Sequence, residues 1–223
     1  MKTAAILVAA GSSRRMGFNK LLAQVAGESV IVHSVRAFEH CAAVDEIIVV
    51  CGEGVRAVLA QAGFSKLKAM VPGGSERHSS VWAGLQAVGE DVSLVAVHDG
   101  ARPLITPEQI GKCIDQALCA QAVACARRST ETLKRCDPEG RVTESIDREG
   151  VWIMETPQVF HLALLRSAYE EVLRLGMLVT DEVSALQTLS IPVVVCENDQ
   201  PNPKVTFPSD LPLIEILHDA RNR

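Results

Sequence analysis

The sequence predicts an α/β fold, with a Rossmann-like, mainly parallel sheet, helices on both faces and a projecting β-hairpin arm. Short apolar runs rich in β-forming residues alternate with longer helical patterns along most of the chain. Hydrophobic residues make up 48% of the 223 residues and aromatic residues 4%, which predicts an aliphatic core. Long linkers and repeats are lacking, so we expect one domain over residues 1–223.

The expected elements follow one another in a regular order. The strands are expected at Ala4–Val8, Glu46–Cys51, Lys68–Val71, Leu94–His98, Ala122–Ala126 and Pro192–Cys196. The helices are expected at Ser29–Cys41, Val55–Ala62, Glu76–Val88, Thr106–Ala120, Leu162–Leu175 and Asp210–Arg221. The fourth helix has the clearest start, with Thr106 as N-cap, Pro107 at the first helical position and Gln109 three residues after the N-cap, as in a capping box.

Residues 127–154 break this alternation. The segment is polar and contains the turn sequence Asp137-Pro138-Glu139-Gly140 beside alternating residues such as Val142 and Ile146. It is therefore predicted to form a hairpin arm. A projecting hairpin has few local contacts to stabilise it, so we expect it to pack on a second subunit in a homodimer.

Composition excludes several classes of protein. The net charge of −5 argues against a nucleic-acid binder, and no apolar run approaches the roughly 20 residues that span a bilayer. The seven cysteines form no Cys-x-x-Cys pair, which favours buried thiols in a reducing compartment over disulfides. The N-terminus leads into a core strand and not a signal peptide, so we expect a cytoplasmic protein.

A loop with glycines and cations follows the first predicted strand. It contains Gly11, Gly17, Arg14, Arg15 and Lys20. Glycines let backbone N–H groups approach an anion and cations neutralise it, which suits a nucleoside triphosphate. The glycine spacing fits neither a P-loop nor a dinucleotide fingerprint, and a basic surface loop remains the plain alternative.

Two more loops follow predicted strands. Asp99 ends the strand at 94–98, where a carboxylate suits Mg²⁺ bound together with substrate phosphates, although it would also suit a turn cap. Gly73-Gly74 precede a helix start that can present backbone groups to a base or phosphate. Further polar residues are scattered along the chain and matter only if the fold gathers them: Thr132, Lys134, Arg148, Thr156, Thr180 and Lys204.

Eight motifs in register give the chain a family resemblance over nearly its whole length. They are Ala-Ala-Gly-x-x-x-Arg-Met, Gly-Gly-x-x-Arg-x-x-Ser-Val, His-Asp-x-Ala-Arg-Pro, Thr-x-Lys, Asp-Arg-x-Gly-x-Trp, Thr-Pro-Gln-x-Phe, Thr-Asp-Glu-x-Ser and Lys-Val-Thr-x-Pro-x-Asp-Leu. Together they resemble the 2-C-methyl-D-erythritol 4-phosphate cytidylyltransferase family, whose members move CMP from CTP to methylerythritol phosphate and release pyrophosphate.

The resemblance implies roles for individual residues. Arg15 and Lys20 would stabilise the charged transition state, and Asp99 would help to hold Mg²⁺. The cytidine would be cradled by Ala9, Ala10, Gly11, Gly74 and Ser80. Methylerythritol phosphate would be held by Thr132, Arg148, Thr156 and Lys204, with support from Arg102, Lys134 and Thr180. Because the family's hairpin is exchanged between subunits, Arg148 or Thr132 is expected to serve the neighbour's site.

Some positions depart from the family pattern. Asn19 and Leu21 flank Lys20 where the family has Pro and Gln, which predicts a looser loop and a lost polar contact. Gly100 replaces alanine and predicts added flexibility. Pro201 stands where an acidic residue often precedes Asn202, so no second metal carboxylate is expected there, although Asp199 is nearby.

Two alternative functions remain open at this stage. A ribitol-5-phosphate cytidylyltransferase shares the first half of the motifs, but Thr132, Lys134 and Arg148 favour methylerythritol phosphate. A non-catalytic nucleotide-binding protein could keep the fold, although such a protein has less need for Arg15, Lys20 and Asp99 together.

Overall fold

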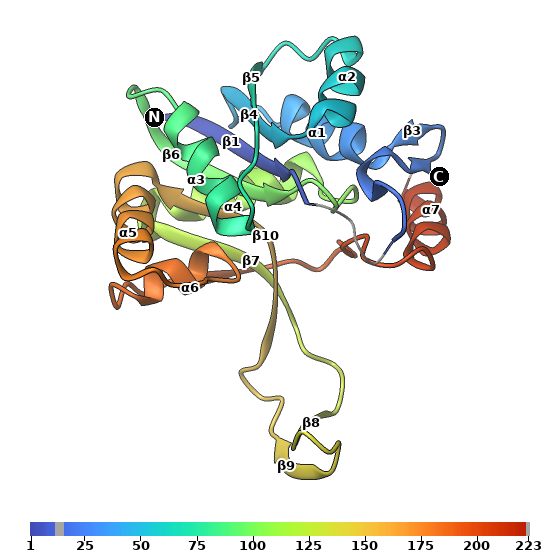
Figure 1. The fold of residues 1–223 in the computed structure, drawn as a ribbon, viewed down its shortest axis with the longest axis vertical. Coiled ribbons are helices and arrows are strands. Elements are labelled where there is room, and N and C mark those ends of the chain that lie inside the picture. Colours follow the sequence, from blue (N-terminus) through green and yellow to red (C-terminus); the bar gives the residue numbers. More distant parts are fainter. Residues whose placement is uncertain (12–15, 222–223) are drawn as a thin grey trace.

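A seven-stranded sheet forms the centre of the molecule in the computed structural model, which describes residues 1–11 and 16–221 (Figure 1). The strands run in the order β11-β7-β10-β6-β1-β4-β5. Their bounds are β1 Lys2–Ala9, β4 Glu46–Cys51, β5 Leu67–Val71, β6 Val92–Asp99, β7 Ala122–Arg128, β10 Trp152–His161 and β11 Val194–Glu197. The four strands β1, β4, β5 and β6 are parallel, so their carboxyl ends meet at one edge. The mainly parallel α/β fold predicted from the sequence is confirmed.

One central strand was not predicted. β10 lies between β6 and β7 and is antiparallel to both. Its middle contains Glu155, Thr156 and Gln158, which are polar yet buried, and this broke the apolar pattern expected of a core strand. The register against β7 shifts between Met154 and Gln158, and such an irregularity is where a sheet tolerates a proline such as Pro157.

Helices cover both faces of the sheet (Figure 1). One face is covered by α1 Val30–His40, α2 Glu53–Ala62, α4 Pro107–Ala120 and α7 Asp210–Arg221, and the other by α3 Arg77–Ala87, α5 Leu162–Leu175 and α6 Glu182–Gln187. The short α6 was not predicted, since six residues give too little periodicity for a sequence signal. Two small elements, η1 Lys20–Leu22 and the hairpin β2 Gln24–Val25 with β3 Glu28–Ser29, connect β1 to α1.

The start of α4 follows the prediction only in part. The Thr106 hydroxyl accepts the Gln109 backbone N–H at 3.2 Å, as an N-cap should. The Gln109 side chain does not complete a capping box. It is buried instead and donates toward the thiols of Cys113, Cys125 and Cys196.

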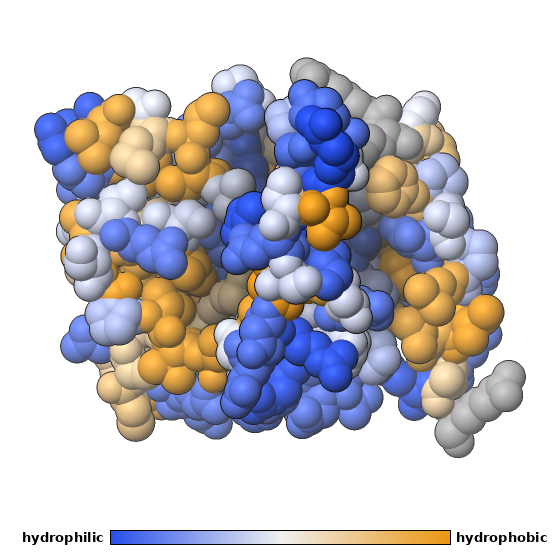
Figure 2. All heavy atoms as spheres, turned by 90° about the horizontal axis from the view of Figure 1, so that it is seen from below, coloured by the Kyte–Doolittle hydropathy of each residue, from blue (hydrophilic) through white to orange (hydrophobic). Residues whose placement is uncertain are grey.

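The arm is an extension of two sheet strands. β7 and β10 stay paired out to Arg128 and Trp152, so the chain leaves the sheet over residues 129–151, slightly inside the predicted limits of 127–154. Beyond them, β8 Leu133–Cys136 pairs with β9 Val142–Ile146 to form a separate two-stranded sheet. Figure 2, which looks onto the arm, shows mainly hydrophilic residues over it and apolar residues gathered on either side.

The cysteines are unpaired, and five of the seven are buried as expected. Cys119 and Cys136 are exposed, because one lies on the outer side of α4 and the other in the arm. Over the described ranges, the helices are too short or too polar to cross a bilayer.

Candidate active site

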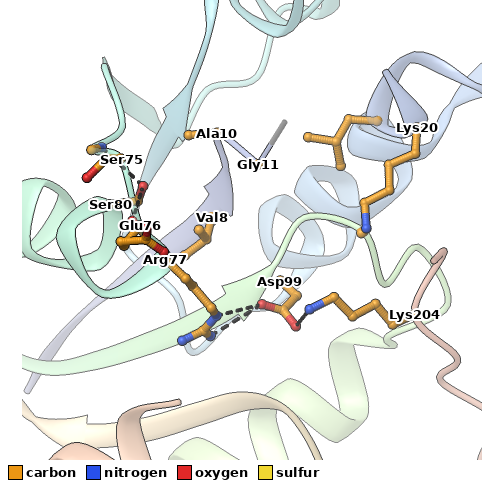
Figure 3. Close-up of a pocket in the computed structure, with 13 residues that line it drawn as sticks. Val8, Ala10, Gly11, Lys20, Ser75, Glu76, Arg77, Ser80, Asp99 and Lys204 are labelled. Carbon is orange, nitrogen blue, oxygen red and sulfur yellow. Dashed lines mark hydrogen bonds and ion pairs between the residues drawn. The ribbon is translucent and has the colours of Figure 1, made fainter. Parts of the chain in front are cut away.

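The loops after β1, β5 and β6 meet at the carboxyl edge of the sheet and line a cavity of about 420 Å³ (Figure 3). Ligands of open α/β sheets bind at this edge. Seven residues named from the sequence line this cavity: Ala10, Gly11, Lys20, Gly74, Ser80, Asp99 and Lys204. Ala9 is buried at the end of β1 and does not line it.

The two glycines after β5 allow close backbone packing. A Cβ on Gly73 would lie 2.2 Å from the Ala10 Cβ, and one on Gly74 would lie 2.4 Å from the Ser79 Cβ. The Gly74 N–H donates to Ser80 Oγ at 3.2 Å, which fixes the loop over the start of α3. Any larger residue at 73 or 74 would therefore force the loop or its neighbours to shift.

Lys20 enters the cavity from the side opposite α3 (Figure 3). Its ammonium donates to the Val205 carbonyl at 2.7 Å. Beside it, the Asn19 side chain accepts the Leu21 N–H at 3.1 Å and closes the turn, a contact that the sequence did not predict. Leu21 is buried and lines the cavity, so an apolar contact replaces the expected polar one. Arg14 and Arg15 lie outside the described residues.

Asp99 ends β6 at the floor of the cavity and is surrounded by cations. Its carboxylate contacts Lys204 Nζ at 2.8 Å, Arg77 at 3.3 Å and Arg102 Nε at 3.7 Å. Burial alone would raise the pKa of Asp99, but Arg77, Lys204 and Arg102 hold that pKa well below its usual range. The carboxylate therefore stays ionised and binds cations at any physiological pH.

A second cavity of about 500 Å³ adjoins the first. It is lined by Arg102, Thr156 and Thr180, and it shares Arg77, Asp99 and Lys204 with the first cavity. The Arg102 guanidinium donates to the Asn202 carbonyl at 2.7 Å, which ties it to the segment that carries Lys204.

Thr156 is fixed by a buried hydrogen-bond chain. Burial lowers the pKa of His98 to about 4, so its ring is neutral at pH 7. Its Nε2 lies 3.2 Å from the Arg102 carbonyl, which can only accept, so Nε2 carries the proton and Nδ1 accepts from the Thr156 hydroxyl at 2.9 Å. The Asp99 N–H then donates to the Thr156 Oγ1 at 3.1 Å. His98 therefore has a structural role, which is to orient the Thr156 hydroxyl.

Sequence reasoning gave no role to Arg77 and Glu182. The Arg77 guanidinium donates to the Glu182 carboxylate at 2.7 and 3.1 Å and to Asp99 at 3.3 Å. Glu182 is fully buried and also accepts the Tyr169 hydroxyl at 3.0 Å. Both residues lie within motifs that carry the family resemblance, and this position in the sequence could have indicated that they have a role.

Three expected substrate residues do not reach either cavity. Thr132, Lys134 and Arg148 lie in the arm and are exposed. The Lys134 ammonium donates to Ser145 Oγ at 2.6 Å within the arm. Arg148 donates to the Thr130 carbonyl and lines a separate hollow of about 390 Å³ at the base of the arm.

The metal-binding chemistry at the site is limited. Within the described ranges, no three His, Cys, Asp or Glu side chains gather closely enough to hold a metal ion by themselves. Asp99 offers one carboxylate at the floor of the first cavity. Mg²⁺ usually binds through one or two carboxylates plus substrate phosphates and water, so this donor set fits an ion that arrives with a nucleotide.

The comparisons with known proteins agree with this geometry. The model of the family described as "IspD: 2-C-methyl-D-erythritol 4-phosphate cytidylyltransferase" matches residues 3–219. The chain belongs to this family. A relative from Symbiobacterium thermophilum, named 2-C-methyl-D-erythritol 4-phosphate cytidylyltransferase, is 39% identical over 98% of this chain and 93% of its own.

Solved structures of the cytidylyltransferase family have the same fold. The 4-diphosphocytidyl-2C-methyl-D-erythritol synthase from Anaerococcus prevotii superimposes with a TM-score of 0.87 at 26% identity, covering 98% of both chains. The 2-C-methyl-D-erythritol 4-phosphate cytidylyltransferase from Thermus thermophilus gives a TM-score of 0.81 at 29% identity, covering 98% of this chain and all of the other.

Proposed function

We propose that this protein transfers CMP from CTP to 2-C-methyl-D-erythritol 4-phosphate and releases pyrophosphate, in non-mevalonate isoprenoid precursor synthesis. The observation that carries the proposal is the pair of adjoining cavities that share Arg77, Asp99 and Lys204. Two anionic substrates can meet where the shared cations lie. The family membership and the relatives' names favour this function over ribitol-5-phosphate cytidylyl transfer or nucleotide binding without catalysis.

The first cavity suits the nucleotide. Backbone and hydroxyl groups of Ala10, Gly11, Gly74 and Ser80 line this cavity and would cradle the cytidine, with Ala9 behind them at the end of β1. The second cavity would hold the acceptor through Arg102, Thr156, Thr180 and Lys204. A phosphate oxygen of the acceptor attacks the α-phosphorus of CTP, a new P–O bond forms, and the bond to the β-phosphate oxygen breaks as pyrophosphate leaves.

Positioning and charge neutralisation supply the catalysis. The attacking phosphate is already ionised, so the site needs no strong general base. Lys20 lies at the first cavity and Arg15 in the same loop, and both would neutralise the charge that develops on the triphosphate. Asp99 would help to hold Mg²⁺ together with the triphosphate, and the ion would supply further neutralisation of the phosphate charge.

The proposal also gives the arm a role, at the acceptor site of a second subunit. We propose that the chain acts as one nucleotidyltransferase domain of a cytoplasmic homodimer, with Arg148 and Thr132 reaching the partner's acceptor site and Lys134 supporting them. The support is that these residues are exposed in the arm and line neither cavity of their own chain. A lone two-stranded hairpin is marginally stable, and a partner would stabilise it.

The test of the activity is pyrophosphate release from CTP with Mg²⁺. Methylerythritol phosphate and ribitol 5-phosphate are offered in parallel as acceptors. Release with methylerythritol phosphate alone supports the proposal, and release with ribitol phosphate alone replaces the acceptor. If the folded protein binds CTP but releases no pyrophosphate with either acceptor, the proposal is replaced by nucleotide binding without catalysis.

The exchange of the arm has its own test. Lys20→Met and Arg148→Ala proteins are each expected to be nearly inactive. Mixing them should form heterodimers with one intact site, and activity should return to about a quarter of the wild-type value, as expected for random pairing of shared sites. If the mixture stays as inactive as its components, Arg148 does not serve the partner.

A further inference from the structure

Glu182 is a buried carboxylate to which the transfer chemistry assigns no task. It is the first residue of α6, its side chain is fully buried, and it lines neither cavity itself, although its side chain bonds Arg77, which lines both. A buried carboxylate costs free energy unless it is paired and hydrogen-bonded. Glu182 is both, with two bonds from Arg77 and one from the Tyr169 hydroxyl.

The contacts of Glu182 continue into the site as a chain. Tyr169 of α5 donates to Glu182, Arg77 of α3 bridges Glu182 and Asp99, and Lys204 contacts Asp99 from the other side. Figure 3 shows Arg77 and Lys204 reaching Asp99 from opposite directions. The chain therefore connects the helices behind the sheet to the floor shared by both cavities.

The end of this chain lies where the two cavities meet. Arg77, Asp99 and Lys204 line both cavities, so the reacting phosphates must come together beside them. Arg77 lies closer to Glu182 than to Asp99, at 2.7 Å against 3.3 Å. The guanidinium is thus held by Glu182 in a fixed plane, and Asp99 is placed against that plane.

We propose that Glu182 is a positioning residue for cytidylyl transfer: it holds Arg77, and Arg77 fixes Asp99 and the Lys204 ammonium at the point where the two substrates meet. This inference rests on the function proposed above and names a further residue of the same site. Tyr169 is the outer support, since its hydroxyl holds one Glu182 oxygen while its ring stacks on Trp82.

The first experiment compares two matched carboxylate-to-amide variants. Glu182→Gln keeps the shape of the side chain and removes the charge that holds Arg77. Glu46→Gln also removes a buried carboxylate, one that is paired with Lys2 and Lys68. None of these three residues lines either cavity. We expect Glu182→Gln to lower kcat by about 10- to 100-fold, the loss typical of a misplaced reacting group, with the KM for CTP changed less than about 3-fold. We expect Glu46→Gln to leave both constants unchanged.

The second experiment asks whether Glu182 acts through Arg77. In an Arg77→Met background, adding Glu182→Gln should lower kcat no further, because the residue through which it acts is already gone. Equal losses in both backgrounds would overturn the inference. So would a folded Glu182→Gln protein with wild-type kcat.

Two more readouts keep the inference testable if Glu182→Gln folds poorly or turnover proves absent. Tyr169→Phe removes only the hydroxyl, and a smaller fall in kcat, about 3-fold, is expected from loss of one hydrogen bond. The Arg77 Nε–H resonance, whose donor contacts Asp99 at 3.3 Å, should shift in Tyr169→Phe and in Glu182→Gln but not in Glu46→Gln. An unmoved resonance in both would overturn the inference, while an inactive wild-type protein with the shifted resonance would count only against the proposed function.

Discussion

Two buried carboxylates lie at opposite edges of the parallel part of the sheet, one on β4 and one on β6, and they differ in the charges that surround them. Glu46 opens β4 at the amino edge, where Lys2 and Lys68 each lie 2.8 Å from it, and Lys2 also pairs with Asp91. Two cations there face two carboxylates. Asp99 closes β6 at the carboxyl edge, where three cations, Arg77, Arg102 and Lys204, face the two carboxylates Asp99 and Glu182.

The difference separates a structural cluster from a functional one. The amino-edge cluster is balanced in charge, and its residues line neither cavity, so its effect is confined to stability. In the carboxyl-edge cluster three cations contact two carboxylates, a lysine from η1 lies nearby, and two cavities lie beside it, which Glu76, Glu155 and Asp181 also line. Cations beside a hollow can contact an anionic ligand, whereas the amino-edge cations line neither cavity.

The sharpest way to break this comparison is to remove one lysine from each cluster. Lys204→Met and Lys68→Met each remove an ammonium 2.8 Å from a buried carboxylate. We expect Lys204→Met to lower kcat/KM on the order of 100-fold, as for loss of one group that stabilises transition-state charge. We expect Lys68→Met to leave kcat/KM unchanged and to cost at most about 1 kcal/mol of stability. Equal kinetic effects would remove the distinction between the two edges.

We also expect the two edges of the sheet to lose stability in different pH ranges. The pKa of His98, which supports the Asp99 edge, is about 4 in the folded state and 6.5 as an ordinary side chain. Between these pH values His98 takes up a proton in the unfolded chain but not in the folded chain. Its contribution to the free energy of unfolding is therefore complete above about pH 6.5 and is lost as the pH falls toward 4. Glu46, whose pKa lies below its usual 4.5, loses its contribution only below that value.

Urea unfolding at pH 7, 5.5 and 4.5 would measure this difference. We expect His98→Gln to flatten the fall between pH 6.5 and 4.5, with part of the slope retained because burial also lowers the pKa of His33. Glu46→Gln should keep the wild-type slope in that range. A steep, unchanged slope in His98→Gln would show that the carboxyl edge is not the acid-sensitive one.

The smallest expected effect concerns two glycines. Gly100 follows Asp99, and a Cβ there would lie 2.7 Å from Ile31 Cδ1 and 3.2 Å from the Val8 carbonyl. Gly111 lies within α4 with nothing within 4 Å of an added Cβ. We expect Gly100→Ala to cost about 1 kcal/mol through overpacking and Gly111→Ala to add about 0.5–1 kcal/mol, as measured by thermal unfolding. A stabilising Gly100→Ala would mean that flexibility, as the sequence suggested, and not packing, explains the glycine.

Local patterns made most of the fold predictable. The apolar runs that became β1, β4 and β6 carry their own signal, and Thr106 and Pro107 mark a helix start within a few residues. β10 could not be found this way, because Thr156 and Gln158 are buried polar residues whose partners, such as His98 and Asp181, are distant in sequence. The burial of polar residues in a strand can be explained only when their hydrogen-bond partners are known.

The same limit applies to the site. Gly74 follows β5, Asp99 ends β6 and Lys20 begins η1 after β1, so all three lie at the carboxyl edge of the sheet, where ligands of such sheets bind. The bond between Arg77 and Glu182 joins residues 105 positions apart and leaves no trace in local spacing. The compensation of Asn19 for a lost proline also depends on where its side chain folds back, which composition does not reveal.

The way the arm leaves the sheet has a consequence for how this protein can change. Arg128 and Trp152 face each other in register at the last pair of the β7–β10 ladder, and the Ser129 N–H donates to the Val151 carbonyl at 3.1 Å. The arm therefore begins and ends at the same pair of residues, so it is an insertion between two neighbouring strands. Its length and sequence can change without altering the order of any strand in the seven-stranded sheet, so the residues that the arm offers to a partner can vary while this chain's own cavities keep their place.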